Sequence, residues 1–519
     1  MPGSDDDGVR ALRAGGSHPI RLPGAQPGET RLPRRGGGIQ RRMYTVAQLV
    51  GGVWGAGGAG GELVVHDPAD GEPVSSVPVA TADEVGKATQ AARNAAGQWA
   101  ATAPAERAAA LHRAADAVAA VTDELAAAVT AEMGKPLADA RGGVEAGIGT
   151  LRQYAELAPL RGGRTLNGAL DAVDFLTPQP RGVVAAITPW NDPVAVSCGL
   201  LGAALVTGNV VLYKPSERTP ATGWLLARAL DEALPAGVLS LLTGGPEVGA
   251  ALAAQDVDVV AHVGSTATGR KIAAAAARTG AKVLLENGGS DPLVVDAGVD
   301  PEWAAEQAAL GAFANAGQIC VAVERIYVHR DVADDFVAAL VRRAAALRVG
   351  PGRDPGTELG PLVDRRHRDH VHGQVSAAVA AAARVRTGGE VPDGPGAYYP
   401  ATVVTDCRHD MVLVREETFG PVAPVVVVDS FDEALTCAGD SPYGLAATVL
   451  TASMSHAQRA WRELPVGTVK VNSVFGGAPG GAAHPRRASG QGFGYGPELL
   501  DEFSAVKAVH IEAPGGGHW

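Results

Sequence analysis

The stretch GVVAAITPWNDPVAVSCGLLGAALVTGNVVLYKPSE, residues 182–217, joins two short β-branched runs through a longer segment rich in alanine and leucine. Residues 194–213 within it carry no charge over 20 positions, which is long enough to span a membrane. Polar residues interrupt this segment, however, and the Gly208-Asn209 step resembles a helix end followed by a strand. We therefore predict a strand, a buried helix and a second buried strand rather than a transmembrane span.

The same alternation continues along the chain. Strands are predicted within residues 182–190, 209–217, 238–245, 259–265 and 282–289, with helices at 221–233 and 268–278 between them. A second alternation runs from 325 to about 472, and residues 81–133 are predicted to be helical. Strands that alternate with helices indicate an α/β fold with parallel sheets, whose ligands bind beyond the carboxyl ends of the strands. Polar residues stand at those ends: Asn191, Lys214, Glu217, Ser265 and Glu286.

Composition indicates a globular protein of two or three domains. The 519 residues are 46% hydrophobic and 19% charged, with mean hydropathy +0.06. The net charge is −12, although residues 1–42 hold eight arginines and only four acidic residues. The remainder is strongly acidic, which argues against nucleic-acid binding. Residues 1–42 are expected to form a disordered leader and are left out of the fold prediction.

The cysteines are few and scattered. They occupy positions 198, 320, 407 and 437, with no CxxC pair and no spacing typical of zinc ligands. The sequence therefore predicts neither a disulfide framework nor a metal site, and it favours a reducing, cytoplasmic setting.

Two glycine-rich segments could be taken for phosphate loops. In GAGGAG, residues 55–60, we predict no preceding strand, and ELVVHDP follows where a helix should begin, so this segment is a decoy. GSTATGRK, residues 264–271, lacks the Lys-Ser/Thr step that phosphoryl transfer needs. Its predicted order of strand, turn and helix start nevertheless suits an anion, the alternative being an ordinary capped helix.

Five motifs in order resemble the aldehyde dehydrogenase superfamily. They are TPWNDP (188–193), KPSE (214–217), GSTATG (264–269), ENGG with GQIC (286–289 and 317–320) and EETFGP (416–421). The resemblance extends from about residue 43 to the end of the chain. It implies a Rossmann-like NAD-binding domain (43–162 and 182–289), an α/β catalytic domain (290–475) and a small β oligomerisation element (163–181 and 490–519). It also implies a homodimer or homotetramer.

The resemblance assigns catalytic roles to Cys320, Glu286 and Asn191. A lone cysteine is more often a small buried hydrophobe, but Cys320 matches the nucleophile that would form a thiohemiacetal and then a thioester. Glu286 would activate water to hydrolyse the thioester, the alternative being a solvated or ion-paired carboxylate. Asn191 would donate to the oxyanion beside the Cys320 N–H, the alternative being a turn residue before Pro193. Asn287 departs from the family's usual leucine.

Cofactor contacts are implied in the same way. Lys214 and Glu217 would bind the adenosine ribose, and a glutamate there disfavours a 2′-phosphate, so NAD is expected rather than NADP. Without the motifs, these two residues would be read as surface charges, and Phe419 as core. The full implied set is Trp190, Lys214, Glu217, Gly245, Gly249, Gly264, Ser265, Gly269, Glu417 and Phe419.

The substrate side departs most from the family pattern. GGAPGGAAHPRRASG, residues 476–490, keeps the family's final Ser-Gly, but alanine and glycine replace its usual aromatic, and His484, Arg486 and Arg487 appear. The implied channel residues are Val196, Gly199, Ile319, Val321, Arg486 and Arg487. A roomy channel near arginines suits a small polar or anionic aldehyde, but Arg486 and Arg487 could equally face solvent or another subunit.

The predicted function is NAD-dependent oxidation of an aldehyde to its carboxylic acid. A first alternative is a dehydrogenase that acylates coenzyme A, against which the presence of Glu286 argues. A second is a non-catalytic homologue with a binding or structural role, against which the intact set of Cys320, Glu286 and Asn191 argues.

Overall fold

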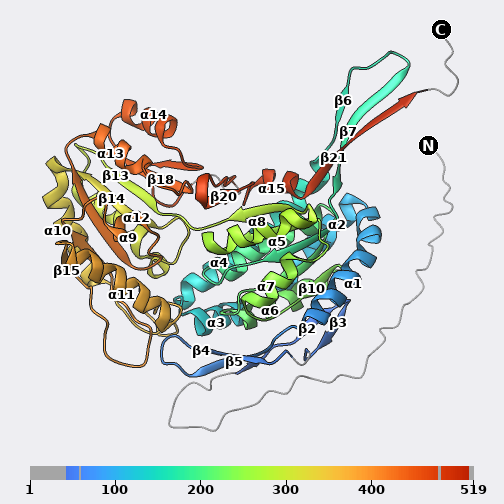
Figure 1. Ribbon diagram of the computed structural model, residues 1–519, viewed down its shortest axis with the longest axis horizontal. Coiled ribbons are helices and arrows are strands. Elements are labelled where there is room, and N and C mark those ends of the chain that lie inside the picture. The colour runs from blue at the N-terminus through green and yellow to red at the C-terminus, as the bar shows by residue number, and fades with distance from the viewer. Residues whose placement is uncertain (1–42, 58–59, 477–480, 513–519) are drawn as a thin grey trace, which may run out of the picture.

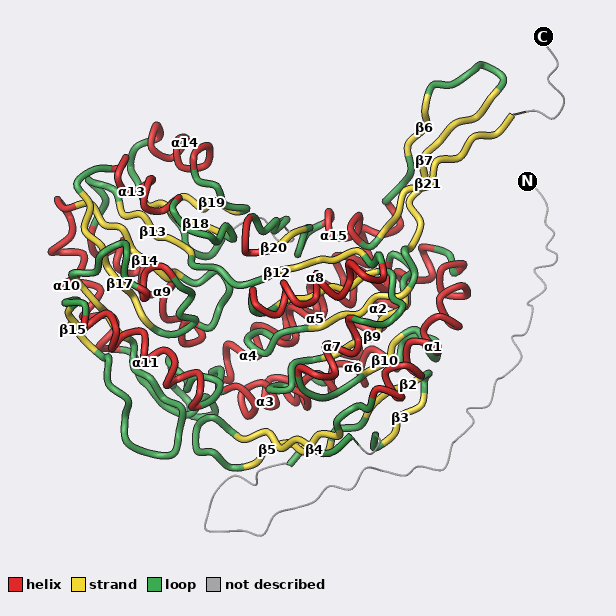
Figure 2. The backbone as a smooth tube through the Cα atoms, in the orientation of Figure 1, coloured by secondary structure: helices red, strands yellow, loops and turns green. Residues whose placement is uncertain are grey.

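The computed structural model describes residues 43–57, 60–476 and 481–512. Two large sheets flanked by helices form two lobes, and a thin three-stranded arm projects from one of them (Figure 1, Figure 2). This architecture confirms the predicted α/β class. The predicted leader, residues 1–42, lies outside the described residues.

The first sheet has a parallel centre with antiparallel strands at both edges. Its order is β20-β12-β11-β8-β9-β10-β2-β3. The strands are β2 (Gln48–Val50), β3 (Val53–Gly55), β8 (Val183–Ile187), β9 (Val210–Lys214), β10 (Leu239–Leu241), β11 (Val259–Val263), β12 (Lys282–Glu286) and β20 (Gly490–Gln491). All five strands predicted for this half of the chain are present, and they form the parallel centre.

Helices pack against this sheet and against one another. They are α1 (Ala82–Ala101), α2 (Pro104–Ala120), α3 (Thr122–Met133), α4 (Leu137–Leu157), α5 (Pro193–Val206), α6 (Pro220–Asp231), α7 (Pro246–Ala253), α8 (Thr266–Thr279) and α15 (Pro497–Glu502). The uncharged segment 194–213 is the buried helix α5 followed by β9, as predicted. No helix among the described residues is long and apolar enough to cross a membrane.

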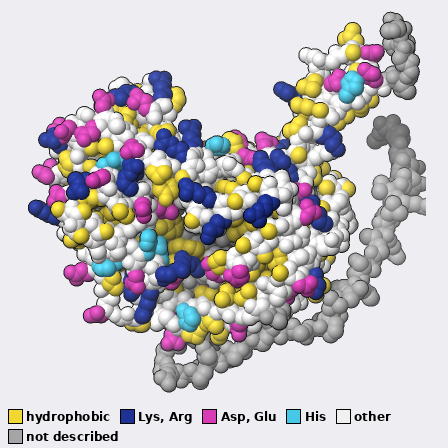
Figure 3. All heavy atoms as spheres, in the orientation of Figure 1, with side chains coloured by type: hydrophobic (Ala, Val, Ile, Leu, Met, Phe, Trp, Pro, Cys, Tyr) yellow, Lys and Arg dark blue, Asp and Glu magenta, His cyan; other side chains and the backbone are white. Residues whose placement is uncertain are grey.

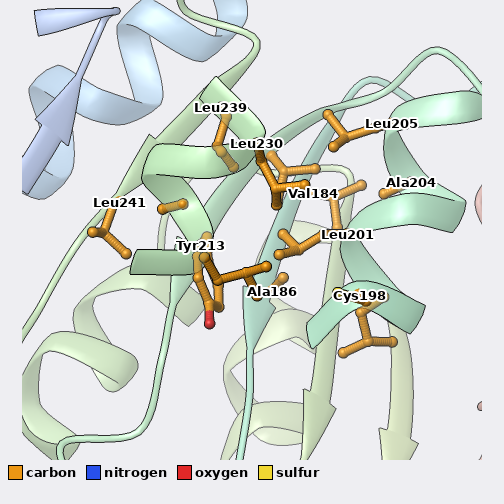
Figure 4. Close-up of a cluster of buried hydrophobic side chains, with 14 of the residues drawn as sticks. Val184, Ala186, Cys198, Leu201, Ala204, Leu205, Tyr213, Leu230, Leu239 and Leu241 are labelled. Atoms are coloured by element: carbon orange, nitrogen blue, oxygen red, sulfur yellow. The ribbon is translucent and has the colours of Figure 1, made fainter. Parts of the chain in front are cut away.

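The core of this lobe is built from small and branched side chains. Val184 and Ala186 of β8 lie with Leu201 of α5 and Tyr213 of β9 in one buried cluster (Figure 4). Cys198 belongs to the same cluster and is fully buried. Dense packing of this kind holds the strand ends in fixed positions, which the loops beyond them need.

The second sheet is parallel except at one edge and has the order β15-β16-β17-β14-β13-β18-β19. Its strands are β13 (Asp291–Val295), β14 (Val323–His329), β15 (Arg384–Thr387), β16 (Thr402–Thr405), β17 (Val422–Val428), β18 (Ala446–Leu450) and β19 (Thr468–Val471). Its helices are α9 (Pro301–Phe313), α10 (Arg330–Ala346), α11 (Arg365–Ala380), α12 (Val412–Arg415), α13 (Phe431–Gly439) and α14 (Met454–Glu463).

The arm consists of β6 (Arg164–Leu166), β7 (Ala172–Pro180) and β21 (Ser504–Glu512). The predicted element 490–519 is therefore only partly right. Residues 490–491 form β20 on the first sheet instead, because the backbone of Gly490 approaches Leu285 too closely for a side chain to fit. Residues 513–519 lie outside the described residues.

A further small sheet corrects one expectation. It contains β1 (Tyr44–Thr45), β4 (Glu62–His66) and β5 (Pro73–Pro78). The GAGGAG segment was expected to have no strand before it, but β3 ends at Gly55, its first glycine. Val53 and Trp54 are strand-forming residues, but a run of two between glycines is too short to signal a strand. β4 follows this segment instead of a helix, so the segment still lacks the context of a dinucleotide loop.

Candidate active site

A cavity of about 240 Å³ lies beyond the carboxyl ends of β8, β11 and β12, where loops of the second lobe meet the first. It collects nine residues that the sequence analysis had singled out. The lining consists of Pro189, Trp190, Asn191, Val196, Arg218, Val263, Gly264, Ser265, Glu286, Asn287, Gly288, Cys320, His367, Glu417 and Phe419.

Cys320 follows a tight turn with unusual backbone angles. Asn315 and Ala316 have φ values of 50° and 56°, and Gly317 follows at 71°. Gln318 fixes the turn, because its Nε2 donates to the Asn315 carbonyl at 3.0 Å while its Oε1 accepts the Val363 N–H at 2.9 Å. Left-handed angles in non-glycine residues persist only where the surroundings hold them, so the turn presents Cys320 in a defined orientation.

Asn191 is bound to this same turn. Its Nδ2 donates to the Gln318 carbonyl at 3.0 Å, and its own carbonyl accepts from Asn315 Nδ2 at 3.1 Å. A primary amide carries two N–H groups, so one remains for an oxygen in the cavity. Asn191 is only 9% exposed, and its side chain is therefore held beside the loop that carries Cys320.

The surroundings of Cys320 keep its thiol protonated at rest. Burial is the main reason that its pKa is raised to about 12, and the carboxyl group of Glu286 is the next. Asp291 and Glu417 raise the pKa further, and the ammonium group of Lys470 lowers it. A thiol is a weak nucleophile, so the cysteine needs a base that removes its proton when it reacts.

Glu286 has the properties of such a base. Burial raises its pKa to about 8, an effect that the Gly494 backbone partly offsets. Its Oε1 is buried without a hydrogen-bond partner among the described residues. A side chain at position 494 would overlap the carboxyl group, so glycine is required there. A carboxyl group with a pKa near neutrality can take up and release a proton under working conditions.

Lys214, Glu217, Gly245 and Gly249 gather outside this cavity, beyond the end of β9. Lys214 is 3% exposed, its Nζ donates to the Pro215 carbonyl at 3.0 Å, and Glu217 lies 3.8 Å away. Gly245 is the N-cap residue of α7, and a Cβ at Gly249 would lie 3.6 Å from the Lys214 stem. Burial lowers the pKa of Lys214. The motif residues implied for the adenosine half therefore lie together.

The turn between β11 and α8 forms the adjoining wall. Ser265 is the N-cap residue of α8, and its Oγ accepts the Thr268 N–H at 3.3 Å. The Thr266 hydroxyl is buried without a partner among the described residues. Gly269 packs so tightly on Asn287 that a side chain there would collide with it. Free donors at the start of a 14-residue helix suit a phosphate group, as expected for this segment.

Glu417 and Phe419 enter from the loop before β17. Glu417 accepts the Gly289 N–H at 3.0 Å, and burial raises its pKa to about 7. Phe419 meets the Trp190 ring edge to face at 5.5 Å, and its carbonyl accepts from His367 Nε2 at 2.7 Å. These contacts close the cavity from the side of the second lobe.

The substrate-channel residues are only partly brought together. Val196 lines the cavity, whereas a Cβ at Gly199 would lie 3.3 Å from the buried ring of Tyr495. Ile319 and Val321 flank Cys320 and are partly exposed, outside the lining of the cavity.

Arg486 and Arg487 do not line the cavity in the described part of the chain. The Arg487 guanidinium donates to the carbonyls of Gly439 and Ser441, at 3.0 and 2.6 Å. Arg486 is exposed. Within one chain, Arg487 therefore binds a loop and Arg486 faces outward. This favours the alternative in which the two arginines do not contact the substrate. Part of the divergent segment, 477–480, lies outside the described residues.

Sequence reasoning missed three residues that line the cavity or tune it. Arg218 stands directly after KPSE and was the easiest to find. His367 follows no motif and reaches the cavity only because α11 packs against the first lobe. Lys470 acts on Cys320 from β19, a strand 150 positions downstream, and only the sheet order brings the two together.

Asn287, which departs from the family pattern, joins the end of β12 to the segment 476–490. Its Nδ2 donates to the Ala488 carbonyl at 3.1 Å.

Comparison with known proteins shows which family has a similar sequence and fold. The aldehyde dehydrogenase family model matches residues 54–509. A 3,6-anhydro-alpha-L-galactose dehydrogenase of Streptomyces coelicolor is 38% identical over 480 residues, covering 90% of this chain and 96% of that protein.

Solved structures of dehydrogenases resemble this fold closely. A 3,6-anhydro-L-galactose dehydrogenase in complex with NAP (NADP) has a TM-score of 0.87 and 34% identity, covering 90% of this chain and 100% of the other. An aldehyde dehydrogenase from Bacillus cereus in complex with NAD+ has a TM-score of 0.88 and 33% identity, covering 90% and 97%. The chain therefore belongs to the aldehyde dehydrogenase family and is an oxidoreductase that acts on aldehydes with a nicotinamide cofactor.

Proposed function

We propose that this enzyme oxidises a small polar aldehyde to its carboxylic acid through a covalent adduct on Cys320, with NAD as the preferred cofactor. One observation carries the proposal. Cys320, Glu286 and Asn191, which lie far apart in the sequence, line a single cavity. Their chemical types supply a nucleophile, a base and an oxyanion donor, which aldehyde oxidation through a thioester requires.

The roles follow from the contacts. Glu286 takes the thiol proton, and the Cys320 sulfur bonds to the aldehyde carbon to give a thiohemiacetal. The free N–H of Asn191 and the Cys320 backbone N–H stabilise the oxygen of this adduct. A bound nicotinamide ring would accept the hydride that leaves the adduct carbon, and a thioester remains. Glu286 then releases this first proton to solvent and removes a proton from water, which attacks the thioester. The acid is released, and the Cys320 sulfur leaves as a thiolate that takes the proton back from Glu286.

The residues present fit a dinucleotide. The α8 N-terminus and the unpartnered Thr266 hydroxyl suit phosphate, and the group at Lys214 and Glu217 suits a ribose. Glu417 would hold the second ribose, and Phe419 and Trp190 would flank the ring. The Glu217 carboxylate disfavours a 2′-phosphate, so we propose NAD over NADP. The NADP-bound relative makes this choice worth measuring directly.

For the substrate we propose a hydroxylated aldehyde, with 3,6-anhydro-L-galactose as the first compound to test. The support is the 38% identity to a dehydrogenase of that sugar. The small side chain of Val196 in the cavity wall is also in keeping with a compact, polar substrate.

We also propose that the domains have the separate roles that the sequence suggested. Residues 43–162 and 182–289 bind the cofactor, and 290–475 form the catalytic domain. The arm, with residues 163–181 and the strand β21, pairs subunits of a homodimer or homotetramer. Exposed apolar side chains on the arm, such as Leu170 and Val506, support this role. The four free cysteines are in keeping with a cytoplasmic location.

The test is formation of reduced cofactor by the purified protein with neutral, cationic and anionic aldehydes, including 3,6-anhydro-L-galactose. NAD and NADP are compared at equal concentration, and Cys320→Ala runs in parallel. We expect turnover with NAD that the variant loses, and a free acid as product whether or not coenzyme A is present. A coenzyme A thioester as product would show that the acyl group is transferred to coenzyme A and not to water. Cofactor reduction that survives in Cys320→Ala would remove the cysteine from the mechanism.

A further inference from the structure

The charge around the cavity is poorly suited to a dinucleotide unless one arginine takes part. The cavity wall carries the carboxyl groups of Glu286 and Glu417, and the nucleotide carries two phosphates. Burial lowers the pKa of His367 to about 4, although its hydrogen bond to the Phe419 carbonyl acts in the opposite direction, so this imidazole is neutral. Arg218 is then the one cationic side chain among the residues that line the cavity. Further lysine and arginine side chains lie on the face of the molecule drawn in Figure 3.

Arg218 is held in place by two contacts. Its guanidinium lies 5.1 Å from the centre of the Trp190 ring, and it forms an ion pair with Asp364 at 2.9 Å. The Arg218 side chain is 19% exposed. A cation held over an aromatic face keeps a defined position, and a guanidinium has five N–H donors, more than one ion pair uses. Trp190 is itself part of the cavity wall, as are Gly264 and Ser265 at the start of α8.

Asp364 is a partner that can be exchanged. It is the N-cap residue of α11, and its Oδ1 accepts the His367 N–H at 2.7 Å. The ion pair uses the other oxygen, Oδ2, so α11 keeps its cap when Arg218 moves away. The Asp364 side chain is 38% exposed, and ion pairs open to water contribute little to stability. A phosphate is a stronger partner, since arginine can bind it through two parallel hydrogen bonds.

We propose that Arg218 binds the diphosphate of the dinucleotide, opposite the α8 N-terminus, and exchanges Asp364 for a phosphate oxygen when the nucleotide enters. The inference rests on the proposed use of a dinucleotide by this cavity. Because Arg218 belongs to the first lobe and Asp364 to the second, the exchange also removes an ion pair that joins the two lobes across the cavity mouth. Asp364 is thus a competitor for Arg218, and its removal favours nucleotide binding.

The test is calorimetric binding to the full-length protein, which requires no aldehyde and no turnover. The ligands are adenosine, AMP, ADP, adenosine 2′,5′-bisphosphate and NAD. The variants are Arg218→Gln, Asp364→Asn and, as a matched control, Arg366→Gln, which removes an exposed arginine close to Asp364. Asparagine is a good helix N-cap, so Asp364→Asn spares α11.

We expect Arg218→Gln to weaken ADP and NAD by about tenfold or more and to leave adenosine unchanged, since only the phosphate contact is lost. Asp364→Asn should tighten ADP binding severalfold, and Arg366→Gln should change nothing beyond about twofold. Equal losses for adenosine and ADP in Arg218→Gln would assign the arginine a structural role and overturn the proposal. Weaker ADP binding in Asp364→Asn would also overturn the proposal, because nucleotide binding would then need the intact ion pair between Arg218 and Asp364.

Three further outcomes show whether the role of Arg218 or the proposed function itself is wrong. A loss confined to adenosine 2′,5′-bisphosphate would move Arg218 to a 2′-phosphate and overturn the diphosphate assignment. If the unmodified protein bound none of the nucleotides, the dinucleotide proposal itself would fail. Normal binding by the unmodified protein and by Arg218→Gln alike would overturn the role of Arg218 alone.

Discussion

Glu324 on β14 holds Phe419 in a left-handed backbone conformation at the cavity wall. The Glu324 carboxylate accepts the Phe419 N–H at 2.9 Å through one oxygen and the Thr418 N–H at 2.7 Å through the other. Phe419 has φ 52°, an angle that costs free energy for a residue with a side chain. The two hydrogen bonds to a buried carboxylate offset this cost. Glu324 thereby positions the loop that also carries Glu417.

Glu324→Gln should loosen this loop. An amide accepts with only one of its two head atoms, so the other would present an N–H to a backbone N–H. We expect the Michaelis constant for the nicotinamide cofactor to rise about tenfold and the free energy of unfolding to fall by about 1–3 kcal/mol. Steady-state kinetics with varied cofactor measure this, and Glu416→Gln, an exposed neighbour, serves as control. An unchanged Michaelis constant would contradict a positioning role.

The pH dependence of turnover should follow Glu286. Burial raises its pKa to about 8, so the carboxyl group is mostly protonated below that pH and becomes a base as the pH rises through it. Hydrolysis of the thioester should therefore accelerate roughly tenfold per pH unit below 8 and level off above it. Glu286→Gln should lose this rise, form the acyl adduct on Cys320 more slowly and hydrolyse it more slowly still, so that mass spectrometry of the intact protein detects the adduct. Glu232→Gln, an exposed carboxyl change, should keep the profile.

Lys470 should support ionisation of Cys320. Its Nζ donates to the Val474 carbonyl at 2.7 Å, and its charge lowers the pKa of Cys320 against the effect of three carboxyl groups. Lys470→Met should shift the pH profile of Cys320 alkylation by iodoacetamide upward and slow the reaction about three- to tenfold at fixed pH. Lys507→Met, on the exposed strand β21, is the matched control. Equal alkylation rates in both variants would show that the Lys470 charge does not act on the thiol.

Glu132 should be essential for stability rather than catalysis. This buried carboxylate on α3 accepts Ser75 Oγ and the Ala221 N–H through Oε1, and the N–H and hydroxyl of Thr222 through Oε2, all at 2.9 Å. Glu132→Gln replaces one acceptor with a donor and should destabilise the protein by about 2–4 kcal/mol. Urea unfolding followed by fluorescence measures the loss, with exposed Glu156→Gln as reference. Equal midpoints for the two variants would contradict this assignment.

The sequence predicted the parallel strands well because each is a short β-branched run that ends in a turn signal. Residues 182–190 and 259–265 show this, as β8 and β11 begin and end inside the predicted ranges. Helix starts were less accurate. α8 begins at Thr266 rather than at 268, since Ser265 caps it and the first turn carries no apolar periodicity.

The site was predictable where motifs mark the strand ends, as for Asn191, Ser265 and Glu286. It was not predictable where a residue reaches the cavity through the packing of one lobe on the other. His367 and Lys470 belong to this second class, because their places depend on where α11 and β19 dock. Arg487 shows the converse. Its charge suggested a substrate contact, but two backbone carbonyls satisfy its guanidinium elsewhere.

The pairing of β20 with β12 has a consequence for how the enzyme is made. β12 carries Glu286, and its outer edge is covered by residues 490–491, about 200 positions later in the chain. Until that segment leaves the ribosome, the strand that bears the base remains an open sheet edge, able to pair with the wrong partner. The first lobe therefore completes its sheet only near the end of synthesis. A nascent chain stalled before residue 490 should be prone to aggregation and should depend on chaperones that shield unpaired strands.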